Sequence, residues 1–368
     1  MKKLIFNKIR KDTLFLFIVL SLSLGLIVWT LQAVNYLDFV TQDGHGFKTY
    51  ILYSIFNFPK IIHRLIPFVF FISLFLILTN YETKNELLIF WTNGITKVYF
   101  AKKILYFSLF LLLFQIFLGG YFSPLSQFKS RMVLKESNTD YFTSLIKDGK
   151  FINVVNGLTI FIEEKENDGS FKNIFIDDSS KVTTKITYAN SGEIIDIDKR
   201  KVFKLYNGSV INKKEDKINV FKFDQINIDL SDYSSNTILV PKVQELSSYK
   251  LINCSLIYFY KTNKNETNCD PSFVKEVNQE LLKRFYKPIY IPLIAIMCCF
   301  LIIFSKNSYK YKTQSRLTFL FGFILLVFSE TTLRYSTSSS FSLIIYLIAP
   351  LIFFVIAYSI FKIKSKNV

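Results

Sequence analysis

Long apolar blocks alternate with polar segments along this chain of 368 residues. Four blocks contain no charged residue, at 14–34, 104–122, 288–304 and 341–361. Two further blocks carry charges, one at about 60–79 within the longer run 51–79 and one at 317–335, which includes Glu330 and Arg334. A helix needs about 20 apolar residues to cross the hydrocarbon core of a bilayer. The pattern therefore predicts six transmembrane helices, three on each side of a long polar segment.

The polar segment between the third and fourth blocks has the two-residue period of β-strands. Apolar and polar residues alternate in six stretches rich in Ile, Val, Phe, Thr and Tyr, at 150–157, 158–164, 171–177, 182–198, 201–211 and 217–230. This alternation is typical of half-buried antiparallel strands. The dipeptides Asn156-Gly157, Asp168-Gly169 and Asn207-Gly208 are candidate tight turns. About eight strands are expected, which favours a β-sandwich or a jellyroll.

These patterns divide the chain into three parts. Residues 1–124 hold the first three transmembrane helices, and residues 125–270 form an inserted all-β domain. Residues 271–286 return to helical spacing, so 271–368 hold a connecting helix and the last three transmembrane helices. The predicted fold class is a helical membrane protein with three plus three spans and an inserted β domain.

Lys and Arg residues indicate how the chain is oriented in the membrane. Residues 1–12 hold five of them, 80–103 four, 305–316 four and 362–368 three. The short segments on the other side, 35–50 and 335–340, hold one between them, Lys48. Cytoplasmic loops carry the excess of basic residues. Both termini are therefore predicted in the cytoplasm and the β domain outside it.

The motifs of common enzyme sites are absent from the sequence. The net charge of +17 does not by itself indicate nucleic acid, because membrane orientation explains much of it. The chain has no GxxxxGK[ST], HExxH, CxxC or GxSxG motif. Two histidines, His45 and His63, are too few for a typical metal centre. We predict no catalytic residue, metal or cofactor, and a role as a permease or scaffold subunit.

Two of the four cysteines are candidates for a disulfide. Cys254 and Cys269 both lie on the predicted external side, in a segment rich in Asn and Lys. An oxidising periplasm would allow them to pair. Cys298 and Cys299 lie in the fourth apolar block and are expected to pack there as apolar residues.

Basic side chains interrupt the second apolar block. Lys60, His63 and Arg64 have the spacing i, i+3, i+4 and so share one face of a helix. The run 51–79 would make about 43 Å of helix, against about 30 Å of hydrocarbon, which places this face near the external boundary. The side chains either extend to the lipid headgroups or bind a phosphorylated headgroup by charge-assisted hydrogen bonds.

Other basic residues are expected at the same depth. Arg284 and Lys287, with Lys283, precede the fourth block, and Arg334 ends the fifth, one turn after its predicted partner Glu330. Basic residues on the external side run against the usual orientation rule. They therefore favour an anionic ligand, and we predict phosphate contacts for Lys60, His63, Arg64, Arg284, Lys287 and Arg334.

The cytoplasmic segment 82–96 has the spacing of a short helix. Leu87, Leu88, Phe90 and Trp91 alternate with polar residues, and Gly94 is a candidate helix stop. The segment is either an interfacial helix between two spans or a coupling helix that docks into a motor subunit. In the second interpretation Glu86 is exposed for a basic partner.

The whole plan resembles the LptF/LptG permeases of the lipopolysaccharide export transporter, and several stretches resemble LptF in particular. These are TLQAVNYLDFV at 30–40, the pair Pro59 and Pro67, NELLIFWTNGIT at 85–96, GLTIFIEEKENDGSFKNIFIDD at 157–178 and ELLKRFYKPIYIPL at 280–293. One departure is that Trp91, Thr92 and Asn93 replace the smaller residues usual before Gly94.

This resemblance implies a specific assembly and task. The chain would pair with an LptG-like second permease in the bacterial inner membrane, around a cavity open to the outer leaflet. An LptB-like ATPase dimer would supply the energy through the coupling residues Glu86, Leu87, Leu88, Trp91 and Gly94. An LptC-like anchored jellyroll protein would receive lipopolysaccharide, whose acyl chains would pass along the interior of a periplasmic jellyroll domain.

Three alternatives stay open at this point. The chain resembles LptG less specifically, and it is also compatible with the permease of a lipoprotein-release transporter. Those permeases usually have four helices, so a count of six would exclude them. A membrane-anchored β-domain scaffold is the non-transport alternative, and it predicts no ATPase partner.

Overall fold

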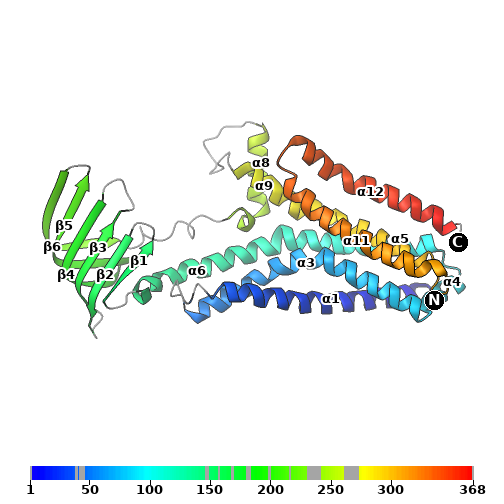
Figure 1. Cartoon of the computed structure of the whole chain (residues 1–368), viewed down its shortest axis with the longest axis horizontal. Coiled ribbons are helices and arrows are strands. Elements are labelled where there is room, and N and C mark those ends of the chain that lie inside the picture. The colour runs from blue at the N-terminus through cyan, green and yellow to red at the C-terminus, as the bar shows by residue number, and fades with distance from the viewer. Residues whose placement is uncertain are drawn as a thin grey trace. The chain divides into compact units, whose positions relative to one another are not determined.

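The computed structural model describes residues 2–37, 40, 46–145, 149–155, 158–166, 170–179, 184–197, 200–214, 217–229, 242–260 and 273–366. Contacts divide the chain into two units (Figure 1). The helical unit comprises residues 1–31, 56–128 and 242–368, and the β unit comprises residues 32–55 and 129–241. Residues 242–260 therefore belong with the helices, although the sequence analysis assigned them to the β domain.

Six helices in the described part of the chain are long and apolar enough to cross a membrane, as predicted. Short helices join or flank them. Helix α4 (Glu86–Thr92) lies in the segment where the sequence predicts a short helix. The 3₁₀-helix η3 (Val243–Glu245) and helix α8 (Ser248–Tyr260) were not predicted. The long ones are α1 (Lys2–Asn35), α3 (Phe47–Thr83), α5 (Lys97–Phe117) with η1 (Leu118–Phe122) and α6 (Ser123–Leu145), α9 (Val274–Leu281) with η6 (Leu282–Tyr286), η7 (Lys287–Ile289), α10 (Tyr290–Cys299) and η8 (Phe300–Ile302), α11 (Tyr309–Tyr335), and α12 (Ser340–Lys366).

Helix α10 lies at the centre of the helical unit. Eight of its ten residues are buried, including Tyr290, Ile294 and Cys298. A helix that is apolar on all sides is expected to be surrounded by other elements. By contrast, α1, α11 and α12 leave many large apolar side chains exposed, such as Phe15, Phe321 and Phe353. Those surfaces match a lipid environment.

Helix α1 packs through a narrow stripe with a four-residue period. Ile9, Thr13, Phe17, Ser21 and Gly25 are all buried. A methyl group on Gly25 would lie 2.6 Å from the end of the Ile62 side chain in α3. Small residues at helix contacts let two backbones approach closely in a membrane.

The β unit contains one antiparallel sheet whose strands pair in sequence order, β1-β2-β3-β4-β5-β6. The strands are β1 (Lys150–Val155), β2 (Leu158–Lys165), β3 (Phe171–Asp178), β4 (Thr184–Ile197), β5 (Arg200–Lys214) and β6 (Lys217–Asp229). Each of the six alternating stretches forms one strand, so the described residues hold six strands rather than about eight.

The apolar face of this sheet is built by cross-strand pairing. Ile160 lies opposite Ile176, and Ile162 opposite Ile174. These residues form a buried cluster with Phe171, Ala189, Phe203 and Leu205. The register thus places the alternate apolar residues on one face, as a two-residue period requires.

The prediction of a turn at Asn207-Gly208 is wrong. Both residues lie inside β5, where Asn207 has a φ of 48°. A Cβ on Gly208 would lie 2.1 Å from the carbonyl oxygen of Tyr188 in β4. Glycine is needed here for a close approach of two strands, which produces the same sequence signal as a turn. Asn156-Gly157 and Asp168-Gly169 lie outside the described residues.

The contact between α3 and α11 generates a stability prediction. A Cβ on Gly322 would lie 2.2 Å from the ring of Phe71, which is 1% exposed and cannot move aside easily. We expect Gly322→Ala to lower the free energy of unfolding by about 1–3 kcal/mol, measured as thermal unfolding of the detergent-solubilised protein. Gly46→Ala is the matched control, because nothing lies within 4 Å of that position. Equal stability of the two variants would contradict this packing.

Candidate functional site

Two segments of the helical unit bring predicted basic residues together. Lys60, His63 and Arg64 lie on α3, and Lys283, Arg284 and Lys287 lie on η6 and η7. The side chain of Lys60 interacts electrostatically with those of Arg64 and Lys283. The His63 ring interacts in the same way with Lys287 and Lys283. We call these six residues the basic cluster. The two groups of three lie roughly 220 positions apart in the sequence, and the structure brings them together as expected.

His63 is inserted into the helix bundle beside a glycine. A Cβ on Gly119, in the π-helix η1, would lie 2.3 Å from the His63 ring. The His63 carbonyl cannot receive the usual helical hydrogen bond, because Pro67 occupies the donor position four residues later. Gln115 Nε2 donates to this carbonyl at 3.5 Å instead. His63 is 6% exposed and therefore packs rather than presenting its ring to a ligand.

Arg284 does not present its guanidinium to a ligand either, which corrects its predicted role. The side chain is 1% exposed. It donates to Glu280 Oε1 at 3.1 Å, to the Leu246 carbonyl at 2.9 Å, to Ser248 Oγ at 3.1 Å and to the Gln244 carbonyl at 2.9 Å. Ser248 in turn donates to the Gly120 carbonyl. Arg284 thus holds the segment 244–248 against α9 and η6.

Two lysines of the basic cluster are neutralised by neighbouring carboxylates. Lys283 Nζ lies 2.8 Å from Glu280 Oε2, and Lys287 Nζ lies 2.5 Å from Glu330 Oε2. The predicted pair Glu330–Arg334 is wrong, because Glu330 on α11 reaches Lys287 instead. A buried ammonium requires a close counter-ion, and the Lys287 side chain is only 10% exposed.

Arg334 lies at the end of α11 and is exposed. Its side chain forms no ion pair with a described residue, and its carbonyl accepts a hydrogen bond from Gln279 at 3.1 Å.

Lys60 and Arg64 differ from the rest of the basic cluster. Lys60 is half-buried and Arg64 is exposed. Neither forms an ion pair with any residue that the structure describes. From Lys60 to the polar residue Asn80 is 20 residues, or about 30 Å of helix, the thickness of the hydrocarbon core. Two unpaired cations thus lie together at one membrane boundary, where an anion can reach them.

The predicted coupling segment forms the seven-residue helix α4. Gly94, at a φ of 68°, ends it: Gly94 N–H donates to the Trp91 carbonyl at 3.0 Å, and Ile95 N–H to the Phe90 carbonyl at 3.1 Å. This is a Schellman motif, in which glycine supplies the left-handed residue. The sequence prediction of a helix stop is therefore confirmed.

One side of α4 is exposed and the other is packed. Leu88 is 58% and Ile89 50% exposed, whereas Leu87 is 1% exposed and lies in the core. Trp91 packs against Phe100 at 5.7 Å between ring centroids. Glu86 forms an ion pair with Lys8 of α1 at 2.8 Å. The exposed apolar surface of α4 is therefore formed by Leu88 and Ile89. Ile89 is not among the residues that the sequence analysis predicted to contact the ATPase.

The remaining predicted sites concern cysteines and metals. Cys254 lies in α8, is 7% exposed and is disulfide-bonded. Its predicted partner Cys269 lies outside the described residues, so the pairing stays a prediction. Cys298 and Cys299 are free and buried. Within the described residues no group of three or more His, Cys, Asp or Glu side chains could hold a metal ion, and His45 lies outside them.

Comparisons with known proteins agree with this architecture. The chain is 24% identical over 323 residues to the uncharacterized protein RP871 of Rickettsia prowazekii (strain Madrid E), an alignment that covers 84% of this chain and 86% of that protein. Residues 8–363 match the family described as lipopolysaccharide export system permease LptF/LptG. Because this match runs through both groups of helices and the β domain, the chain belongs to the LptF/LptG permease family.

Proposed function

We propose that this chain is the LptF-type subunit of a lipopolysaccharide export transporter in a bacterial inner membrane. It extracts lipopolysaccharide from the outer leaflet and passes it to a periplasmic bridge, and a separate ATPase supplies the energy. The observation that carries the proposal is the pair of unpaired cations, Lys60 and Arg64, at one membrane boundary of a chain from this family. The phosphorylated headgroup of lipopolysaccharide is the anion that they would bind.

The contacts within the basic cluster support a division of labour. Arg284, Lys283 and Lys287 are engaged by protein groups and hold α9, η6 and α11 in place. Lys60 and Arg64, on the rigid helix α3, are held beside them with free hydrogen-bond donors. A site built on helices keeps its donors in position before the ligand arrives. Arg334 is the third contact in this proposal, because its side chain is exposed and forms no ion pair with a described residue.

The β domain would take the acyl chains. Its apolar face, which includes Ile160, Ile174, Phe203 and Leu205, is a continuous strip along the sheet. In this proposal the domain lies in the periplasm, and its face continues into a neighbouring jellyroll of an LptC-like partner. The other partners are an LptG-like permease and an LptB-like ATPase dimer that docks on α4.

The phosphate contacts are tested by removing both charges. We expect Lys60→Gln with Arg64→Gln to weaken lipopolysaccharide binding by at least about tenfold, because each charge-assisted contact contributes roughly 1.5–3 kcal/mol. Photoreactive residues at positions 60 and 64 should label lipopolysaccharide in cells. The matched control is Lys102→Gln with Lys310→Gln, which removes two exposed charges near the opposite membrane boundary. Unchanged binding in the first double variant would mean that the two side chains only reach toward lipid headgroups.

The orientation is tested with reporter fusions. We expect a reporter that is active only in the periplasm to be silent when fused after Val368 and active when inserted near Asp177 in β3. The expectation follows from the excess of Lys and Arg on one side of the six spans. The reverse pattern would overturn the assignment of Lys60 and Arg64 to the outer leaflet.

The docking of the ATPase is tested on α4. Glu86→Lys reverses the charge of the first residue of the helix, whose side chain is 27% exposed, and Leu88→Asp places a charge on the exposed apolar surface of the helix. We expect both variants to lose co-purification with the ATPase and lipid export, while the six-helix protein still accumulates in the membrane.

Lys8→Gln separates docking from local structure. It breaks the Lys8–Glu86 ion pair, whose lysine side chain is 60% exposed, but it leaves Glu86 available. An exposed pair of this kind contributes little to stability, so export should persist. If Lys8→Gln were as harmful as Glu86→Lys, the role of Glu86 would be to position α4 and not to contact the ATPase.

A further inference from the structure

The connection between α10 and α11 is held from both sides of helix α4. It comprises residues 303–308, which follow η8, and we call it the α10–α11 turn. Glu82 and Thr83 are the last two residues of α3, before α4, and Lys97 begins α5, after it. Only two residues separate α3 from α4, and four separate α4 from α5. Because these connections are short, α4 cannot be displaced far without moving both of its neighbours.

Three hydrogen bonds attach the α10–α11 turn to these neighbours. Lys306 N–H donates to Glu82 Oε1 at 2.7 Å, and Lys306 Nζ donates to the Thr83 carbonyl at 2.9 Å. On the other side of α4, Lys97 Nζ donates to the Ile303 carbonyl at 2.8 Å. Each bond satisfies a backbone group at or beyond a helix end, where the regular pattern no longer supplies a partner. One partner in each bond is ionised, which strengthens it relative to a neutral hydrogen bond.

Glu82 is the central residue of this arrangement. It is 8% exposed, although a glutamate is seldom buried without partners. Lys97 interacts with it electrostatically, and so does Tyr311 in the first turn of α11. A buried charge is tolerated where hydrogen bonds and an opposite charge compensate it. The Glu82 carboxylate therefore fixes the α10–α11 turn relative to α3 and α5.

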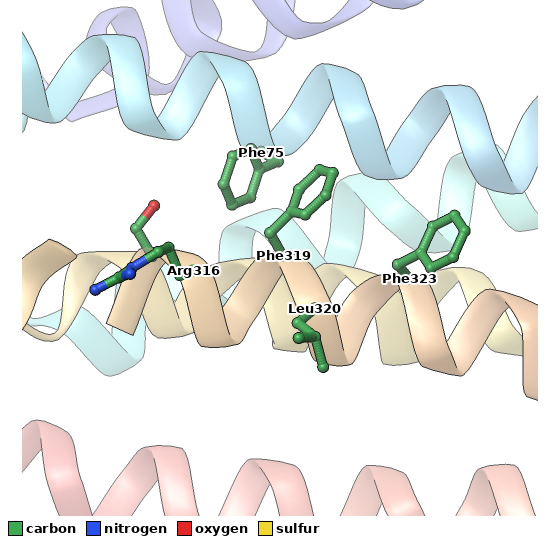
Figure 2. Close-up of a pocket in the computed structure, with 6 residues that line it drawn as sticks. Phe75, Arg316, Phe319, Leu320 and Phe323 are labelled. Carbon is green, nitrogen blue, oxygen red and sulfur yellow. The ribbon is translucent and has the colours of Figure 1, made fainter. Parts of the chain in front are cut away.

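Helix α11 stays attached to α3 beyond the turn. Figure 2 shows Phe319 of α11 and Phe75 of α3 directed toward one another, and their ring centroids are 5.2 Å apart. The ring of Phe319 also lies 5.7 Å from that of Phe71, against which Gly322 packs. Helix α11 therefore contacts α3 at successive levels from the turn to Gly322. Helix α10, on the other side of the turn, has eight of its ten residues buried, and a closely packed interior resists displacement.

We propose that Glu82 and Lys97 are positioning residues that join α4 and the first half of α11 into one moving body. A displacement of α4 then reaches α11 through the α10–α11 turn, while α10 stays in place. The inference rests on the docking of an ATPase on α4 proposed above. It adds the route by which that docking moves a particular transmembrane helix, and the two residues that form the route.

The first test needs no ATPase. Spin labels are attached to the full-length protein at Thr92, which is exposed at the end of α4, and at Tyr309, which is 96% exposed at the start of α11. Pulsed electron paramagnetic resonance measures the distribution of distances between them. We expect a narrow distribution that becomes broader in the double variant Glu82→Leu with Lys97→Met. Glu82→Gln alone keeps an oxygen that can accept the hydrogen bond, so it should keep the distribution narrow.

A second label pair separates this attachment from general loss of structure. Labels at Thr92 and at Lys102, an exposed residue of α5, span α4 and its neighbour without crossing the α10–α11 turn. Their distances should stay unchanged in the double variant. Broadening of both pairs, or of neither, would overturn the proposal. Lys97→Met alone removes one of the three hydrogen bonds and should broaden the first pair less, which keeps the test decisive if the double variant does not accumulate.

The second test measures lipopolysaccharide exported per ATP hydrolysed by the complete transporter. We expect the double variant to lower this ratio at least about fivefold, the lower end of typical couplings between sites. The ATPase should still co-purify and hydrolyse ATP, because α4 itself is unchanged. Lys102→Met, which removes an exposed charge from the same helix as Lys97, is the matched control and should leave the ratio unaltered.

Three outcomes of the second test are informative. Loss of ATPase co-purification in the double variant would mean that Glu82 and Lys97 serve docking, which would overturn the proposal. An unchanged ratio would also overturn it, because the displacement would then pass through other contacts, such as the hydrogen bond from Tyr81 to Asp12 of α1. Failure of the unaltered protein to bind an ATPase would refute the docking on α4 instead, and the spin-label distances would still decide whether α4 and α11 form one body.

Discussion

Backbone carbonyl groups that leave the regular helical pattern must find donors inside the protein, and this requirement shapes the helical unit. Inside a bilayer no water is available to satisfy them. Gln115 donates to the carbonyl left open by Pro67, Gln279 to the last carbonyls of α11, and Arg284 to two carbonyls of the segment 244–246. The same three side chains connect elements that are far apart in sequence. The hydrogen bonds that satisfy these backbone carbonyl groups therefore also hold the helices of the bundle together.

This constraint also decides which cations remain available. The guanidinium of Arg284 donates its hydrogen bonds to groups of the protein, including the Leu246 carbonyl. The ammonium of Lys287 is buried and forms an ion pair with Glu330. Lys60 and Arg64 lie on the face of α3 that no carboxylate approaches within ion-pair distance, among the described residues. A basic patch seen in the sequence is therefore not a uniform ligand site. Its buried members organise the scaffold, and its unpaired members are the ones that we propose to bind the headgroup.

Much of this arrangement could be predicted from the sequence, since periodicity reflects burial directly. The six helices, the six alternating segments and the stop at Gly94 are all present, and the resemblance to the LptF/LptG family is confirmed by the match over residues 8–363. Residue type alone could not separate Arg284 from Arg64, because burial depends on which distant segment packs against each. The same limit explains why Glu330 was assigned to Arg334, its neighbour along the helix, and not to Lys287 on another element.

The two π-helices have a consequence for how the chain can vary. Each π-helical turn holds one residue more than an α-helical turn, so η1 offsets the phase of α6 relative to α5 by about 100°. Deleting one residue from 118–122 would restore a regular helix and rotate everything after it by that angle. Ser126, which donates to the Phe56 carbonyl at 2.5 Å, would then face a different direction. The length of this segment is therefore as constrained as its composition, and a single-residue deletion there would be worse tolerated than most substitutions.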